Sequence, residues 1–449
     1  MPQSNIKYVK EYLKEEKKVT ECSGTRKVGR REFMGTAAAA ASFMIMAPQL
    51  VRGTAANSAL RVGLLGCGGR GTADATYTIE TGKARLVALA DLFQDKLIKA
   101  KAHFDKFQQA KGIPAIERRL IFRGPEAYKE ISNSKDVDVV IITTPPYFHP
   151  QHLAEVVTAG KHVYCEKPVA VDPHGCVSVL DSARRAEGRL SLEVGFQLRN
   201  APPYVEQVKR IHAGALGDIV SGEGHYYATW PKLPDWPNAS ADERMIRNWY
   251  YSRILSGDII VEQNIHIIDV CNWILQAHPI VASASGSHNG RLDDGDVYGH
   301  YSVVFKYPNG VSLTFGSTQI GNAKWEVGWR FFGTQGVSEA HYSGPVAIYG
   351  DNAWQWNGGE ASSQQASQGF STAGVFHDNL EQADPEKKMS FVDSILNNQF
   401  HNQAAQGVES AISCMMARHS AYTGREVSYE TMATSGEHWD CDIDLNQFA

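Results

Sequence analysis

The stretch of residues 60–71, LRVGLLGCGGRG, constrains the fold more than any other part of the sequence. An apolar run ends in a GxGxxG pattern formed by Gly66, Gly68 and Gly71, and a segment with helical periodicity follows. In a strand, turn and helix of this kind, the glycines permit a tight turn, a close approach of the backbone to a pyrophosphate, and close packing of helix on strand. The pattern therefore predicts the first βαβ unit of a dinucleotide-binding domain.

Asp91 supports this prediction because it ends the next apolar run, ARLVALAD, about twenty residues after the glycines. A carboxylate at that position can accept hydrogen bonds from the ribose hydroxyls of the adenosine, and it would repel a ribose 2′-phosphate. We therefore expect NAD as the cofactor, with NADP disfavoured. We expect Arg70, inside the turn, to contact the pyrophosphate.

The order of strand-like and helical segments predicts an α/β protein with two sheets. From residue 57 to residue 192 the two kinds of segment alternate, which predicts parallel βαβ units in a doubly wound Rossmann sheet that binds NAD. From 193 to 384 most strand-like runs are separated by Gly, Asn, Asp or Pro, which predicts an open, mainly antiparallel sheet in a substrate and oligomerisation domain. Residues 385–449 read as helices that pack back on both domains.

Residues 1–56 read as a leader for export. Arg30 and Arg31 precede an apolar run of about a dozen residues, and Thr54, Ala55 and Ala56 resemble a cleavage site of small residues. The paired arginines indicate the twin-arginine pathway and a periplasmic or otherwise exported protein. The apolar run is short for a bilayer, so we expect no stable membrane insertion; whether the leader is cleaved stays open.

The composition of the chain limits which classes of partner and which kinds of site we expect. The formal net charge is −5 and charged residues make up 21% of the chain, so nothing indicates a nucleic-acid partner. Seven cysteines occur without a CxxC pair, and we expect no disulfide framework. We also expect no metal, because the acid, histidine and acid of the segment GDIIVEQNIHIIDV do not follow a common zinc or iron spacing.

Lys167 follows an apolar strand directly, in the segment YCEKPVAVD. In an open α/β sheet ligands gather at the carboxyl ends of the strands, and a lysine in a partly desolvated cleft can act as a general acid or base. A solvated loop lysine fits that position equally well. A helix expected near residues 258–275 favours the catalytic interpretation, because at 100° per residue Glu262, His266 and Asp269 share one polar stripe. A buried acid, histidine and acid network without catalysis is the alternative.

These motifs together resemble the Gfo/Idh/MocA family of oxidoreductases: GCGGRG at the turn, TTPPYFH at the fourth strand, EKP after the fifth, and GDIIVEQNIHIID on the helix. The resemblance implies that Lys167 transfers the proton with His266 as its partner. Glu262 stands where the family usually has aspartate, and Asn264 where many members have glycine, so the orientation of the substrate can differ. The resemblance extends the cofactor contacts to six further residues: Thr143, Thr144, Pro145, His149, Glu166 and Lys167. It places Arg199, Asn264 and Asp269 at the substrate, although for Arg199 a surface salt bridge fits nearly as well.

The activity implied is hydride transfer to or from a secondary hydroxyl of a sugar, polyol or glycoside, with tightly held NAD. The twin-arginine pathway moves folded proteins, so NAD bound in the cytoplasm could travel with the chain. The alternative is a glycoside hydrolase that oxidises a hydroxyl transiently, and Lys167 disfavours it because the hydrolase branch lacks this lysine. A nucleotide sensor without catalysis is a third interpretation. The resemblance also implies a homo-oligomer formed through the open sheet.

Overall fold

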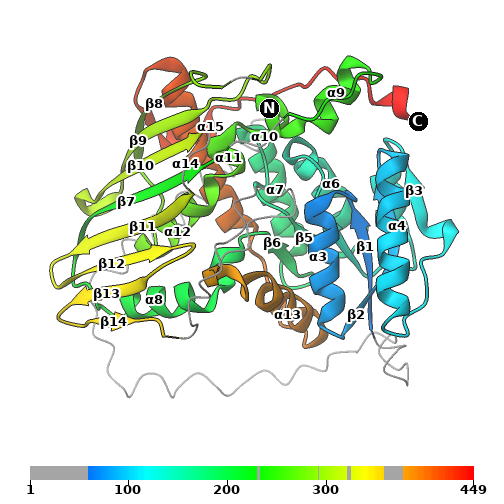
Figure 1. Ribbon diagram of the computed structural model, residues 1–449, viewed down its shortest axis with the longest axis horizontal. Coiled ribbons are helices and arrows are strands. Elements are labelled where there is room, and N and C mark those ends of the chain that lie inside the picture. The colour runs from blue at the N-terminus through cyan, green and yellow to red at the C-terminus, as the bar shows by residue number, and fades with distance from the viewer. Residues whose placement is uncertain (1–58, 230–232, 292, 321–324, 358–377) are drawn as a thin grey trace. The chain divides into compact units, whose positions relative to one another are not determined.

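A six-stranded parallel sheet forms the first half of the described chain (Figure 1). The computed structural model describes residues 59–229, 233–291, 293–320, 325–357 and 378–449. The strand order is β3-β2-β1-β4-β5-β6, in which the connection reverses between β1 and β4 and so opens a crevice at their carboxyl ends. The strands are β1 (Leu60–Leu65), β2 (Ala84–Asp91), β3 (Ile121–Arg123), β4 (Val139–Ile142), β5 (His162–Cys165) and β6 (Leu192–Val194).

Helices connect these strands and cover the sheet. They are α3 (Gly69–Glu80), α4 (Gln94–Gln109), α5 (Ala127–Asn133), α6 (His149–Thr158) and α7 (Pro173–Ala186). Leu64 and Ile141 of the central strands are fully buried, and Phe391 of the late helix α13 (Ala383–Leu396) packs into the same core. A segment more than 300 residues from β1 in sequence thus completes the core of the first sheet.

A nine-stranded sheet forms the second layer, with the order β14-β13-β12-β11-β7-β10-β9-β8-β15. All its neighbouring strands are antiparallel except β10 and β7, which run parallel. The strands are β7 (Ile219–Ala228), β8 (Val281–Ser287), β9 (His300–Lys306), β10 (Ser312–Gln319), β11 (Glu326–Gly333), β12 (Gly336–His341), β13 (Val346–Gly350), β14 (Trp354–Gln355) and β15 (Val427–Ser428). The two sheets confirm the predicted fold class.

One face of the second sheet is covered by helices that also contact the first half of the chain. Helix α14 (Ala404–Thr423) packs on β8 and on α7, while α12 (Ile265–Leu275) packs on β7 and α8 (Pro202–His212) on β13. Three shorter helices, α9 (Ala241–Arg247), α10 (Arg253–Ser256) and α15 (Tyr429–Thr434), complete this part. Figure 1 shows α12 and α14 between the nine-stranded sheet and the Rossmann sheet.

The helix expected at residues 258–275 is interrupted. It forms α11 (Ile259–Glu262) and α12, and between them the Asn264 N–H donates to the carbonyl of Ile259, five residues earlier, at 3.0 Å. Such a wide turn inserts one residue into the helix, and wide turns of this type are frequent at functional sites. One inserted residue rotates everything after it by about 100° relative to Glu262.

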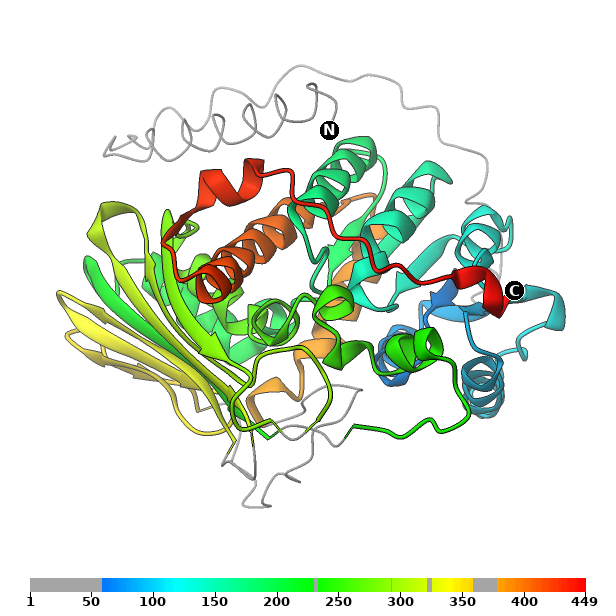
Figure 2. The same ribbon diagram turned by 90° about the horizontal axis from the view of Figure 1, so that it is seen from above.

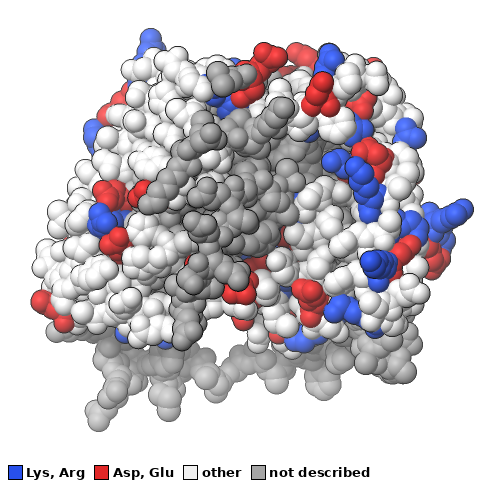
Figure 3. Space-filling view, in the orientation of Figure 1, with Lys and Arg blue, Asp and Glu red and all other residues white. Residues whose placement is uncertain are grey.

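Residues 60–449 form one compact unit, and the domain boundaries inside it stay a prediction. The predicted leader, with Arg30 and Arg31, lies outside the described residues. Among the helices of the described ranges, none has the length and apolar character to cross a membrane. On the face shown in Figure 3, basic and acidic side chains are interspersed and do not gather in a large patch of one sign.

Candidate functional site

The glycine turn has the geometry that its sequence predicts. Gly66 has a φ of +95°, and its N–H donates to the carbonyl of Ala90 at 2.9 Å. A Cβ at Gly71 would lie 2.2 Å from the Gly66 carbonyl oxygen, so only glycine lets helix α3 start this close to the strand. A Cβ at Gly68 would meet nothing within 4 Å, and this open backbone borders the cavity. The turn therefore fits a pyrophosphate approaching at Gly68 and the helix N-terminus.

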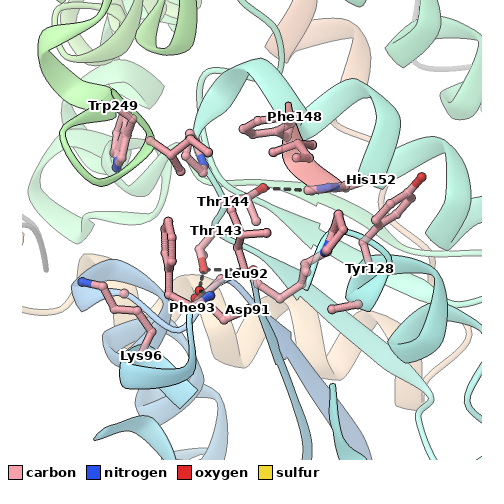
Figure 4. Close-up of a pocket in the computed structure, with 18 of the residues that line it drawn as sticks. Asp91, Leu92, Phe93, Lys96, Tyr128, Thr143, Thr144, Phe148, His152 and Trp249 are labelled. Carbon is pink, nitrogen blue, oxygen red and sulfur yellow. Dashed lines mark hydrogen bonds between the residues drawn. The ribbon is translucent and has the colours of Figure 1, made fainter. Parts of the chain in front are cut away.

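A cavity lies at the carboxyl ends of β1, β2 and β4 (Figure 4). Six residues predicted to bind the cofactor line it: Gly66, Gly68, Asp91, Thr143, Thr144 and Pro145. Leu92, Phe93 and Tyr128 add apolar and aromatic walls beyond Asp91. A polar rim beside the phosphate turn and an apolar chamber behind it suit the two ends of an adenosine diphosphate group.

Asp91 is fixed by the backbone. Its Oδ2 accepts the Cys67 N–H at 2.7 Å and its Oδ1 accepts the Phe93 N–H at 2.8 Å. Burial raises the pKa of Asp91 above its usual value, whereas these two N–H groups act in the opposite direction. Each oxygen keeps a second lone pair, so the carboxylate can still accept a ribose hydroxyl.

Arg70 and Glu166 lie outside the cavity lining, which differs from the contacts expected for them. The Arg70 Nε donates to Glu166 at 2.9 Å, and its two Nη atoms donate to Asp384 of α13 at 2.8 Å each. Lys388 of α13 lies 2.7 Å from Asp74 of α3, inside the same buried cluster. The carboxylates of Asp74, Glu166 and Asp384 thus surround the Arg70 guanidinium, because α13 brings Asp384 next to the turn. Arg70 links the phosphate turn to the residue that precedes Lys167.

His149 also has a supporting position. Its Nδ1 lies 2.7 Å from the Pro168 carbonyl oxygen and its Nε2 lies 2.7 Å from that of Thr144. The side chain is 1% exposed and is outside the cavity lining. It therefore joins the loop after β4 to the loop after β5, while the next histidine, His152, lines the cavity and lies 3.0 Å from the Thr144 hydroxyl.

Lys167 and Glu262, two of the three candidate catalytic residues, form an ion pair. The Lys167 Nζ donates to Glu262 Oε1 at 2.8 Å and to the backbone carbonyl of Glu262 at 2.6 Å. The side chains are 11% and 10% exposed. Burial lowers the pKa of His266 well below its usual value, and the nearby Lys167 ammonium acts in the same direction. The site therefore combines an ammonium, a carboxylate and a neutral imidazole.

Asn264 beside this trio and His266 within it have polar atoms that no described residue satisfies. Asn264 is completely buried, yet neither its Oδ1 nor its Nδ2 has a hydrogen-bond partner among the described residues. The Nδ1 of His266 is also unpartnered there. Leaving such groups unpaired costs about 1–3 kcal/mol each, so a polar ligand with hydroxyl groups fits this place.

Arg199 and Asp269 pair with each other rather than with this trio. The Arg199 Nε and Nη2 donate to the two Asp269 oxygens at 2.8 and 3.0 Å, and Ser410 of α14 donates to Asp269 at 2.8 Å. Asp269 is completely buried. The inserted residue at Asn264 explains the difference from the expected single stripe, because it rotates Asp269 away from the face of Glu262. Arg199 and Asp269 thus connect α12 with α14 and with the segment that follows the Rossmann sheet, and their contact with a substrate stays a prediction.

Four residues that the sequence does not predict line the cavity from outside the Rossmann segment. Ile246 and Arg247 come from α9, Trp249 comes from the short helix η4 (Trp249–Tyr251), and Leu445 comes from the end of the chain. The Arg247 guanidinium lies 3.9 Å from the centre of the Phe93 ring. No motif or spacing marks these positions, since they reach the site only through the fold.

Two family models match the sequence. The model described as an oxidoreductase family with an NAD-binding Rossmann fold matches residues 60–194, and the model of the GFO/IDH/MocA C-terminal domain matches residues 204–339. Together the matches cover more than half of the chain. The chain belongs to the Gfo/Idh/MocA family of oxidoreductases.

Curated relatives and solved structures agree with membership of the Gfo/Idh/MocA family. An inositol 2-dehydrogenase/D-chiro-inositol 3-dehydrogenase of Lactiplantibacillus plantarum is 31% identical over 33% of this chain, and the match covers 37% of that enzyme. An inositol 2-dehydrogenase of Rhizobium meliloti is 25% identical over 64% of this chain and 78% of its own length. A levoglucosan dehydrogenase, solved with NADH and levoglucosan, shares the fold with a TM-score of 0.64 at 19% identity, over 82% of this chain and 99% of its own.

Proposed function

We propose that this Gfo/Idh/MocA protein is an NAD-dependent dehydrogenase that acts on a secondary hydroxyl of a sugar, polyol or glycoside. The observation that carries the proposal is the contact of Lys167 with Glu262 beside a neutral His266 and an unpartnered Asn264. The inositol dehydrogenases among its relatives and the levoglucosan dehydrogenase that shares its fold support this substrate class.

The residues of the chain divide the work as follows. When bound, the nicotinamide supplies the acceptor or donor of the hydride. Lys167 Nζ exchanges the proton of the substrate hydroxyl, and Glu262 Oε1 stabilises the ammonium form of Lys167. His266, kept neutral by burial, can donate or accept a hydrogen bond at the same oxygen. Asn264 offers both a donor and an acceptor to a second hydroxyl of the substrate.

NAD is preferred to NADP in this proposal. The Asp91 carboxylate lines the cavity next to the place for the adenosine ribose, where it favours two hydroxyl groups and opposes a phosphate. The proposal includes tight retention of NAD and export by the twin-arginine pathway, which rests on Arg30 and Arg31 in the sequence. Fractionation of cells that express the full chain tests the location, and a protein found wholly in the cytoplasm contradicts it.

The open sheet is proposed to join copies of the chain. Val304, Phe332 and Tyr349, on strands β9, β11 and β13 of this sheet, are 43%, 38% and 48% exposed, and burying such apolar side chains favours association. Light scattering on the purified protein tests this, with Phe332→Glu expected to shift the mass towards the monomer. A wild-type protein that is monomeric at micromolar concentration contradicts it.

The activity is tested by incubating the protein with NAD and a panel of inositols, aldoses and glycosides while the absorbance of NADH is followed. Lys167→Met is expected to lower the rate by about 10²–10⁴ with nucleotide binding retained. Lys209→Met is the matched control, because Lys209 is 77% exposed. If Lys167→Met turns over like the wild type, the assignment of Lys167 is wrong; if nitrophenyl glycosides are hydrolysed without added NAD, the hydrolase alternative replaces the dehydrogenase.

A further inference from the structure

The last described segment of the chain, residues 437–449, crosses the surface of the Rossmann half; we name it the terminal strap. Figure 2 shows it running in red from α15 past α7 and α6 to the neighbourhood of α4 and β3. It contains one short helix, η7 (Leu445–Phe448), and is otherwise without helix or strand. Its position is set by specific contacts at both ends.

The first anchor is Trp439. Its N–H donates to Asp172 Oδ2 at 2.7 Å, and its ring lies 3.9 Å from the guanidinium of Arg418. Arg418 in turn donates to the carbonyl of Val171, in the loop that carries Lys167, and to that of Gly257, just before helix α11, which carries Glu262. The start of the strap is therefore connected, through Arg418, to the segments that carry Lys167 and Glu262.

The second anchor is Phe448, which packs edge-on against Phe93 with the ring centres 5.5 Å apart and is 9% exposed. The neighbouring Gln447 donates to Asp242 at 2.7 Å and accepts from Ser240 at 2.8 Å. Both partners lie at the start of helix α9. The strap and α9 are thus fastened together as well as to the Rossmann half.

Between the anchors, the strap reaches the cavity itself. Leu445 lines it together with Ile246, Arg247 and Trp249 of the α9 region, opposite the glycine turn and Asp91. Arg247 is held over Phe93 by a 2.9 Å ion pair with Asp95 of α4. The outer wall of the cavity therefore consists of residues far in sequence from the Rossmann motif.

The position of this wall identifies the part of the nucleotide that it covers. Pyrophosphate belongs at Gly66 and Gly68, and the ribose belongs at Asp91, so the chamber beyond Asp91 that Phe93 and Tyr128 line belongs to the adenine. A nucleotide seated there would lie against Leu445 on its outer side, and the contact of Phe448 with Phe93 holds this part of the strap in place. A wall that must move for a ligand to leave slows its dissociation.

We propose that the terminal strap and α9 form the outer wall of the adenosine compartment, and that their closure retains the nucleotide. The proposal rests on the proposed function, since it assumes that the compartment receives NAD or NADH. It assigns to Leu445 and Phe448 a positioning role for the cofactor that the family motifs do not contain. It also gives a physical cause for the tight retention of NAD in an exported enzyme.

The test measures the release of NADH, followed by its fluorescence after dilution or displacement by excess NAD, from the full chain and from three variants. Phe448→Ala is expected to raise the dissociation rate at least about tenfold, which corresponds to the loss of about 1.4 kcal/mol of contact. A chain that ends at Asp442 is expected to raise it further. Ile98→Ala is the matched control, because Ile98 is on the same domain, 60% exposed and outside the cavity lining.

The outcomes separate the two proposals. A full chain that binds NADH and releases it at the same rate as Phe448→Ala and the shortened chain overturns the role of the strap but leaves the proposed function intact. A full chain that binds no NADH overturns both. Thermal unfolding of each variant shows whether it folds, and if the shortened chain does not, Phe448→Ala decides the question.

Discussion

Asp384→Asn tests the buried charge cluster that fastens α13 to the phosphate turn. Asp384 accepts two hydrogen bonds from Arg70 at 2.8 Å and is 2% exposed. Burial alone would raise the pKa of Asp384, but Arg70 lowers this pKa to about 2 from its usual 3.8. By linkage, this difference corresponds to about 2 kcal/mol of stability at neutral pH.

The charges of the cluster explain why Asp384→Asn should lower the free energy of unfolding less than the removal of a cation would. Arg70 and Lys388 face the carboxylates of Asp74, Glu166 and Asp384, so the asparagine leaves two cations with two carboxylates. Lys388→Met would instead leave one cation with three carboxylates in a buried place. Its expected cost is about 3–5 kcal/mol, which is typical of a buried pair that loses one partner.

Urea unfolding at pH 7, followed by tryptophan fluorescence, measures both costs. Asp393→Asn is the control on the same helix, because its ion pair with Lys83 has side chains 38% and 42% exposed and should contribute less than about 1 kcal/mol. A lowered pKa stabilises the fold only above the usual pKa, so the difference between wild type and Asp384→Asn should narrow as the pH falls below about 4. An Asp384→Asn cost no larger than that of Asp393→Asn would refute the assignment of this cluster as a strong structural tie.

Two further predictions concern the glycine turn after β1 and the start of helix α11. Gly71→Ala should lower the free energy of unfolding by about 1–3 kcal/mol because its Cβ meets the Gly66 carbonyl, whereas Gly68→Ala should leave stability within about 0.5 kcal/mol but weaken NADH binding about tenfold; equal effects of the two alanines on stability and binding would contradict this. Burial raises the pKa of Asp258 to about 6, so its contribution is present below about pH 4 and is lost as the pH rises through 6. Urea unfolding should therefore show a fall of about 3 kcal/mol between pH 4 and 7 that Asp258→Asn removes, and the same pH dependence in both proteins would contradict the protonation of Asp258.

The fold could be predicted from the sequence where the signals are local. The parallel strands at the glycine turn and the seven longer strands of the open sheet are apolar runs with clear breakers between them, and the structure contains them. The strands β3, β14 and β15 were missed because they are only two or three residues long. The register of β15 is set by pairing with β8, about 145 residues earlier, and no local pattern records such a partner.

The site divides in the same way. The glycine turn and Asp91 have their predicted surroundings, because the turn directly follows β1 and Asp91 ends β2. Asp269 does not, because a regular period of 100° per residue cannot anticipate the residue inserted at Asn264. Asp384, which accepts hydrogen bonds from Arg70, is 314 residues away from it in the sequence, and Leu445 of the cavity wall is farther still. Only the tertiary structure brings these two residues to the site.

The motif residues that do not line the cavity have a common role. Arg70 joins the phosphate turn to Glu166, which accepts the N–H of Lys167 at 3.1 Å. His149 joins the cavity loop at Thr144 to Pro168, directly after Lys167. Each of these side chains thus connects a loop of the cavity to the segment that carries Lys167.

Such ties matter because proton and hydride must move in one arrangement of substrate and cofactor. A displacement of about 1 Å between the nicotinamide and Lys167 is enough to lower a rate about a hundredfold. Polar clamps between the two loops resist that displacement better than apolar contacts do, since each hydrogen bond fixes a direction as well as a distance. We therefore infer that Arg70, Glu166 and His149 belong to the motif because they hold the cavity and Lys167 in a fixed relation, and a variant such as Glu166→Gln should lower the rate of turnover more than it lowers NADH affinity.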